Sequence, residues 1–142
     1  MQQLFITGVY SVFYLQDNGV KVEFANGGHP PLVWYRAANQ SVELVKSPGT
    51  VIGMIESVRY KKREITMERG DRIFIFTDGI PEVENNTKQM IGFEEDLTSL
   101  FRKSSRRELG DMLDAVLENV RDFAGDAEID DDILIIGIEV TG

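Results

Sequence analysis

The chain has 142 residues, 42% of them hydrophobic, which suits a single domain with its own buried core. Its formal net charge of −9 disfavours nucleic acid and anionic membranes as main partners, because both bind basic surfaces. Cysteine is absent and histidine occurs once, which excludes disulfides, thiolate zinc sites and histidine-rich metal sites and leaves carboxylates as ligands for any metal.

The first half of the chain predicts strands separated by turns. Segment 4–15 is rich in β-branched and aromatic residues and apolar on both alternating faces, which predicts a strand covered on both sides. Asp17-Asn18-Gly19 supplies a turn, and alternation over 20–24 predicts the second strand of a hairpin. Further strands are predicted at 32–35, 42–45, 58–67 and 72–77.

The apolar period lengthens to about 3.6 residues after Asp78-Gly79, which indicates helices. A short helix is expected over 93–102, and Ser105 with Glu108 fits a capping box before a second helix over 109–123 that Gly125 ends. A buried last strand is expected over 133–140. Many strands with a late helical pair predict an α+β domain with helices on the face of an antiparallel sheet, and two stacked sheets as an alternative arrangement.

Acidic residues stand at the ends of two predicted strands. Asp78 follows the strand at 72–77, and the run 130–132 precedes the strand at 133–140. If these strands are antiparallel neighbours, the carboxylates meet at one sheet edge, where they suit Mg²⁺ or Mn²⁺. From spacing alone a structural role is the more frequent outcome, because Asp-Gly is a turn dipeptide and an acidic run is usually a solvated loop.

Seven short segments are weak signals individually, but their common order and spacing would rarely occur by chance. They are FIT at 5–7, ANGGHPP at 25–31, Gly53, ERGDR at 68–72, FTDGIPE at 76–82, IGF at 91–93 and DDI at 131–133. The set resembles the SpoIIE/RsbU-like branch of the PPM family of metal-dependent Ser/Thr protein phosphatases, over nearly the whole chain. This resemblance implies one domain over 1–142, an antiparallel β-sandwich flanked by helices.

The resemblance also implies a dinuclear Mn²⁺ or Mg²⁺ centre at one end of the sandwich, where an activated water attacks phosphoserine or phosphothreonine. Asp78 and Asp131 match metal ligands of the family, and Asp130 leaves a one-residue ambiguity in that match. His29 and Asn26 fall in the motif that ends in two prolines, so we expect them to shape a loop rather than to bind metal.

Residues beside these ligands are expected to support them. Gly79 is predicted to form the tight turn after Asp78 with a positive φ, and Asp132 to hold the loop or a metal-bound water. Glu82 is predicted to be a helix-start carboxylate, with a supporting contact to the metal site as the alternative. Leu134 replaces the threonine that the family usually has, so a hydroxyl that would brace the loop is missing there.

The sequence lacks the GD-x-x-G-H-G-like motif that precedes FIT in the family and supplies the aspartate bridging both metals. Gly70-Asp71 matches a later turn motif and does not replace it. We therefore expect a fold without the N-terminal strands and helices of the family, at most a partial metal site, and little or no activity in this chain alone. The apolar surface left around 5–13 predicts a homodimer or strand exchange.

The leading hypothesis is a bacterial signalling phosphatase that acts on a phosphorylated regulatory protein, such as an anti-sigma-factor antagonist. The alternatives are a non-catalytic phosphatase-like module for interaction or oligomerisation, and an unrelated β-rich binding domain. No apolar run approaches the ~20 residues of a membrane span, and no export signal is evident at the N-terminus. We therefore expect a cytoplasmic protein that binds neither nucleic acid nor membrane.

Overall fold

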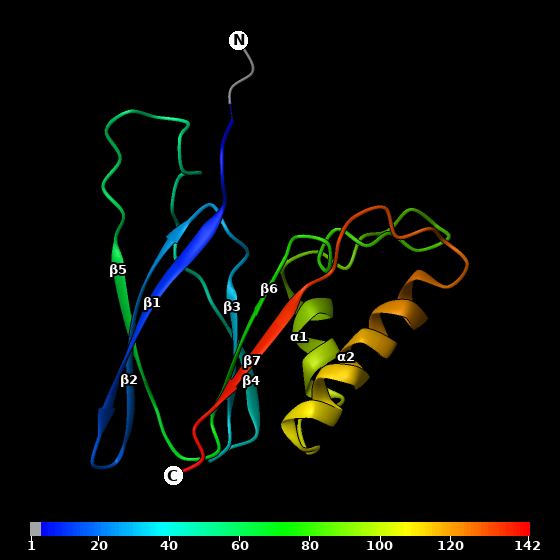
Figure 1. Cartoon of the computed structure of the whole chain (residues 1–142). Coiled ribbons are helices and arrows are strands. Elements are labelled where there is room, and N and C mark those ends of the chain that lie inside the picture. Colours follow the sequence, from blue (N-terminus) through cyan, green and yellow to red (C-terminus); the bar gives the residue numbers. More distant parts are fainter. Residues whose placement is uncertain (1–3) are drawn as a thin grey trace.

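The computed structural model describes residues 4–142 as two antiparallel sheets and two helices (Figure 1). The strands are β1 (Gly8–Gln16), β2 (Gly19–Gly27), β3 (Leu32–Arg36), β4 (Ser41–Val45), β5 (Lys62–Met67), β6 (Arg72–Phe76) and β7 (Ile135–Glu139), and the helices are α1 (Glu95–Arg102) and α2 (Leu109–Ala124). The smaller sheet has the order β1-β2-β5 and the larger sheet the order β4-β3-β6-β7. This architecture confirms the α+β class and the antiparallel sandwich with helices. Residues 1–3, which precede the first predicted strand, lie outside the described residues.

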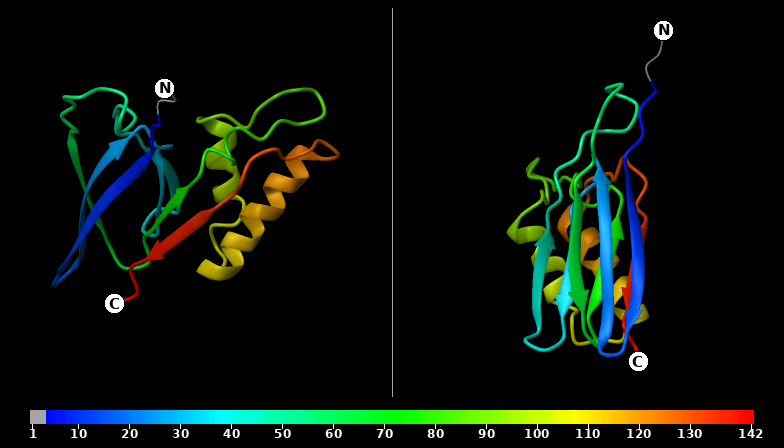
Figure 2. Two further views of the ribbon diagram at one scale, coloured as in Figure 1. Left: turned by 45° about the horizontal axis from the view of Figure 1, so that its top comes forward. Right: turned by 90° about the vertical axis from the view of Figure 1, so that its left-hand side faces the viewer.

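The elements form three layers, with the larger sheet between the smaller sheet and the two helices (Figure 2). β6 serves both interfaces, because alternate residues of a strand point to opposite faces. Ile73 packs between the sheets, whereas Phe74 and Phe76 pack against the helices. This double burial explains why the sequence of β6 is apolar with little alternation. Within residues 4–142, neither helix is long and apolar enough to cross a membrane.

The predicted hairpin is confirmed. β1 and β2 pair in antiparallel register down to Gln16 and Gly19, so a tight turn joins them. Val22 and Phe24 of β2 are buried between the sheets. Glu23 lies on the opposite, outer face of the smaller sheet, where Lys21 and Lys62 pair with it at 2.7 and 3.1 Å.

The first strand differs from its prediction. It begins at Gly8 rather than Leu4, and Ile6 instead forms two backbone hydrogen bonds with Ile52, of 3.0 and 2.9 Å. Tyr10, which lies on the same outer face of the smaller sheet as Glu23, is 74% exposed. The prediction of a strand covered on both sides is wrong, because within residues 4–142 β1 is an edge strand and no element packs over the outer face of its sheet.

Two further predictions about the C-terminal half need correction. The last strand, β7, is an edge strand of the larger sheet and only partly buried, with Ile136 47% exposed. The capping box is also wrong: Glu108 occupies the N-cap of α2 without a side-chain hydrogen bond, and the Ser105 hydroxyl donates to the carbonyl of Arg102 at 3.0 Å. Ser105 therefore closes the end of α1. Gly125 ends α2, as predicted.

Arg72 ties the helical layer to the larger sheet. Its buried guanidinium pairs with Glu139 on the neighbouring strand at 2.9 Å. It also donates to the carbonyl of Arg107 at 2.7 Å and lies 5.5 Å from the centre of the Tyr35 ring. One charged side chain thus fixes the connection between the helices against the start of β6.

Candidate metal centre

β6 and β7 bring two loops together at one end of the larger sheet. Phe76 pairs with Ile135, and the backbone N–H of Thr77 donates to the carbonyl of Leu134 at 3.0 Å. This confirms the antiparallel neighbour relation that the sequence analysis assumed. The loop that follows β6 and the loop that precedes β7 therefore meet.

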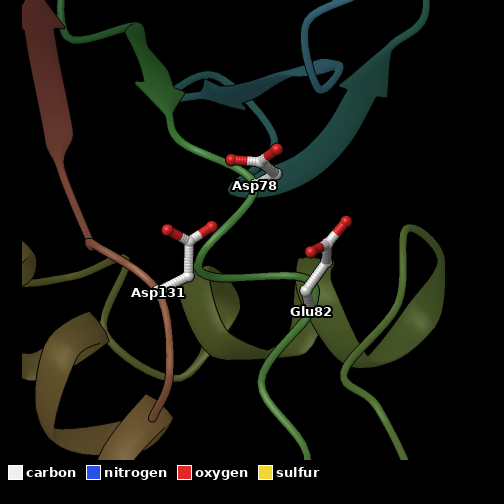
Figure 3. Close-up of side chains that lie close together, drawn as sticks. All are labelled: Asp78, Glu82 and Asp131. Atoms are coloured by element: carbon white, nitrogen blue, oxygen red, sulfur yellow. The ribbon is translucent and has the colours of Figure 1, made fainter.

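Three carboxylates converge where these loops meet (Figure 3). One oxygen from each of Asp78, Glu82 and Asp131 lies within 4.8 Å of the other two, and all three side chains are exposed. Asp130, the alternative to Asp131, is not part of this group. Carboxylates so close repel one another, and a divalent cation would relieve that repulsion. An oxygen-only donor set with room for water fits Mn²⁺ or Mg²⁺.

Glu82 joins the group because of the turn that follows β6. The backbone N–H of Glu82 donates to the carbonyl of Asp78 at 3.0 Å, so residues 78–82 form one helical turn and both side chains share a side. The prediction of a helix-start carboxylate is wrong, since α1 begins only at Glu95. The spacing of four residues between two acids after a strand was the signal available in the sequence.

Gly79 is required for a reason other than the predicted one. It is not among the glycines with positive φ. A Cβ atom built on Gly79 would instead lie 2.4 Å from the carbonyl oxygen of Asp132. The turn at 78–82 thus packs directly on the backbone of the loop before β7, and only glycine permits this approach.

Thr77 fastens the two loops, a role that the sequence analysis missed. Its hydroxyl donates to the carbonyl of Asp132 at 2.8 Å and accepts from the backbone N–H of Leu134 at 3.0 Å. Asp132 therefore holds the loop through its backbone, and its N–H also donates to the Asp131 carboxylate at 2.7 Å. Thr77, which follows the neighbouring strand β6, thus makes the hydroxyl contacts that Leu134 cannot make.

Asn26 lies near the end of β2, and His29 lies in the loop that follows this strand. The buried Asn26 side chain donates to the carbonyl of His29 and accepts from its N–H, both at 2.8 Å, which closes the loop. The imidazole lies close enough to the Asp78 carboxylate for that negative charge to influence its pKa. Burial lowers the pKa of His29, and Asp78 and the Phe76 carbonyl partly oppose this effect. His29 thus neighbours the carboxylate group without belonging to it.

An open cavity of about 500 Å³ adjoins the carboxylates. Its lining includes Gly79, Glu82 and Asp131, together with Lys88 and Met90 of the following loop. The site can therefore receive a ligand from solvent at the same place where it would hold a cation.

Known proteins share this fold. In sequence, the chain is 24% identical over 135 residues to the phosphoserine phosphatase RsbU of Bacillus subtilis (strain 168); the match covers 94% of this chain and 38% of RsbU. In structure, it resembles the PP2C phosphatase domain, with a fragment of the regulatory domain, of the cell fate determinant SpoIIE from Bacillus subtilis. That comparison gives a TM-score of 0.74 at 20% identity and covers 99% of this chain and 40% of the other.

The catalytic domain of the serine threonine protein phosphatase PstP, solved in complex with 2 manganese ions, gives a TM-score of 0.62 at 8% identity over 96% of this chain and 60% of that one. At such identities the likeness shows a shared fold. The chain spans well under half the length of RsbU.

The family assignment rests on a match over almost the whole sequence. The family model described as stage II sporulation protein E (SpoIIE) matches residues 1–141. This agrees with the motif pattern of the sequence and with the sandwich architecture of the solved PP2C domains. The chain therefore belongs to the SpoIIE family of PPM-type protein phosphatase domains.

Proposed function

We propose that this chain serves metal-dependent hydrolysis of phosphoserine or phosphothreonine on a bacterial regulatory protein. The observation that carries the proposal is the convergence of Asp78, Glu82 and Asp131 from two loops that strand pairing brings together. The likeness to the phosphoserine phosphatase RsbU supports a phosphorylated protein as substrate, for instance an anti-sigma-factor antagonist.

In this proposal Asp78 and Asp131 hold Mn²⁺ or Mg²⁺, and Glu82 completes the oxygen donor set. When bound, such an ion lowers the pKa of a bound water and neutralises charge on the phosphoryl oxygens. Thr77 and Gly79 keep the two ligand-bearing loops in contact. His29, Asn26 and Asp132 shape the surrounding loops and bind no metal.

For this chain by itself we propose at most a partial metal site and little turnover. The sequence contains no GD-x-x-G-H-G-like motif, the segment that supplies the bridging aspartate in the family it resembles. Two ions act together on the attacking and leaving oxygens of a phosphate ester, so one ion provides only part of that stabilisation.

Calorimetric titration of the chain with Mn²⁺ tests the metal site. We expect saturable binding that Asp78→Asn abolishes and Asp130→Asn retains, because Asp130 has the same charge, lies next to Asp131 and is outside the carboxylate group. Equal loss in both variants would mean that net charge, rather than this geometry, attracts the ion. No binding to the unaltered chain would leave the non-catalytic interaction module as the better proposal.

We also propose that a second copy of the chain covers the open side of the sandwich. β1 and β7 are both edge strands and lie on the same side of the molecule (Figure 2), where Phe13, Leu15 and Ile138 line a groove of about 310 Å³. Free strand edges beside exposed apolar side chains favour pairing with another chain.

Sedimentation velocity over a range of concentrations tests this dimer. Leu15→Lys, which places a charge in the groove, should weaken self-association by at least about tenfold. Met90→Lys is the matched control, since Met90 is 56% exposed but lies outside the groove. A monomer at all concentrations contradicts the dimer and leaves the metal site unaffected.

A further inference from the structure

A second cavity, of about 440 Å³, lies beside the turn that carries Asp78 and Glu82: Phe93 lines it, and the backbone N–H of the preceding Gly92 donates to the carbonyl of Pro81 at 2.8 Å. Its volume lies in the lower part of the range of about 300–1,000 Å³ for ligand pockets, which suits a short stretch of peptide. The loops after β2 and β4 and the segment before α1 provide its walls. Its lining includes His29, Pro31, Lys46, Ser47, Pro48 and Phe93.

The cavity is preformed because its two main loops are in direct contact. A Cβ atom at Gly49 would lie 1.6 Å from the carbonyl oxygen of Asn26, so the backbones touch there. Asn26 also fixes the loop of His29 through its two hydrogen bonds. Pro31 and Pro48 restrict the backbone on either side. A cavity held in this way loses little conformational entropy when a ligand enters.

One polar side chain of the cavity has no hydrogen-bond partner among residues 4–142. Ser47 is only 6% exposed, and its hydroxyl has no partner among the described residues. Unpaired buried polar groups destabilise a folded chain, so a ligand that supplies partners is favoured.

The remaining walls select an apolar, uncharged ligand. Phe93 is 41% exposed, and Pro31 and Pro48 also line the cavity. Lys46 is the charged side chain of the lining, and its ammonium already pairs with Glu94 at 2.7 Å. Apolar walls with a few neutral polar groups suit an apolar side chain together with the peptide backbone that carries it.

We propose that this cavity is the subsite for the residue next to the phosphorylated residue of a protein substrate, and that it takes an apolar side chain. The inference rests on the proposed function, because the phosphate would lie at Asp78 while its neighbour in the peptide occupies the cavity. Ser47 hydrogen-bonds the peptide backbone, and Phe93 contacts the apolar side chain. These two residues then determine substrate specificity.

Titration of the ¹⁵N-labelled chain with peptides in the presence of Mg²⁺ tests the subsite, followed through the amide signals of Ser47, Phe93 and Gly79. The probes are acetylated peptides with phosphoserine between leucines or between glycines, the unphosphorylated leucine peptide, and inorganic phosphate. Both leucine peptides should shift the Ser47 and Phe93 signals. The glycine peptide should bind about tenfold more weakly than its phosphorylated leucine counterpart.

Variants of the cavity should remove the preference for leucine. Phe93→Ala and Ser47→Ala are expected to bind the two phosphopeptides alike. Tyr60→Ala is the matched control, because Tyr60 is 38% exposed and outside this cavity, and it should keep the preference.

The outcomes separate this inference from the proposed function. If phosphate shifts the Gly79 signal but the unaltered chain binds leucine and glycine peptides alike, the subsite is overturned and the proposed function stands. Unchanged preference in Phe93→Ala overturns the subsite as well. If phosphate leaves Gly79 unaffected while the leucine peptides still shift Ser47, the proposed function fails, and the assignment of the cavity to a phosphatase fails with it.

Discussion

The larger sheet and the smaller sheet of this molecule are covered to different extents. β6 of the larger sheet packs against the smaller sheet on one face and against helices on the other. β1 of the smaller sheet has a free edge, and Leu15 near its end is 87% exposed. The three carboxylates stand on loops attached to the larger sheet, so the better packed layers fix their positions. The less covered sheet offers free strand edges, which suit contact with another chain.

A substitution under the larger sheet should have the largest effect. Phe101 is fully buried, with its ring centre 4.9 Å from that of Phe74 and 5.9 Å from that of Phe76. Phe101→Ala should lower the free energy of unfolding by about 3–5 kcal/mol in urea titrations, because it leaves a cavity between helix and sheet. Tyr10→Ala, at a position that is 74% exposed on β1, should change it by no more than about 0.5 kcal/mol. Similar losses in both variants would contradict the contrast between the two sheets.

The buried ion pair of the larger sheet should come next. Arg72→Met leaves Glu139 without its partner and removes the link to the helix connection, at a cost of about 2–3 kcal/mol in the same measurement. The cost is below that of a fully buried pair, because the Glu139 side chain is 21% exposed and solvent screens its charge. Lys21→Met removes a side chain that is 33% exposed, against 10% for Arg72, and leaves Glu23 paired with Lys62, so it should cost much less. A larger loss for Lys21→Met would reverse the ranking of the two sheets.

Thr77→Val tests whether the larger sheet positions the carboxylates. Loss of the hydroxyl leaves the carbonyl of Asp132 and the N–H of Leu134 without their partner, which should cost about 1 kcal/mol of stability. Mn²⁺ affinity in calorimetry should also fall, since the two loops are no longer fastened to each other. Thr77→Ser keeps the hydroxyl and should retain the affinity. Unchanged affinity in Thr77→Val would show that strand pairing alone holds the site.

The sequence predicted those parts of the site that depend on local pattern. The apolar strand that ends at Phe76 and the acidic run before β7 were visible as periodicity and composition. Their antiparallel pairing was the one assumption needed to bring Asp78 and Asp131 together, and the register of β6 with β7 confirms that pairing.

The parts that were missed depend on contacts between distant segments. Gly79 is needed because of the carbonyl of Asp132, and Thr77 acts on the same distant loop, so neither role has a local signature. The spacing of Asp78 and Glu82 is a local signal, but a single turn at 78–82 is too short to be distinguished from the start of a helix. The exposure of Leu15 was missed for a similar reason, since an apolar strand does not reveal whether a layer covers it.

The smallest expected effect concerns the outer face of the smaller sheet. Hydrogen bonds from Lys21 and Lys62 lower the pKa of Glu23 from 4.5 to about 2. A carboxyl with a lowered pKa stabilises the folded chain above its unfolded pKa, and this contribution disappears as the pH falls through the folded value. The stability difference between the unaltered chain and Glu23→Gln should therefore be constant near neutral pH and shrink as the pH falls from 4.5 towards 2.

Urea titrations across this pH range measure the stability difference, and about 1 M NaCl should reduce it because salt screens charges that are accessible to solvent. A difference that persists at the lowest pH and in high salt would mean that Glu23 stabilises the smaller sheet through packing rather than through its charge.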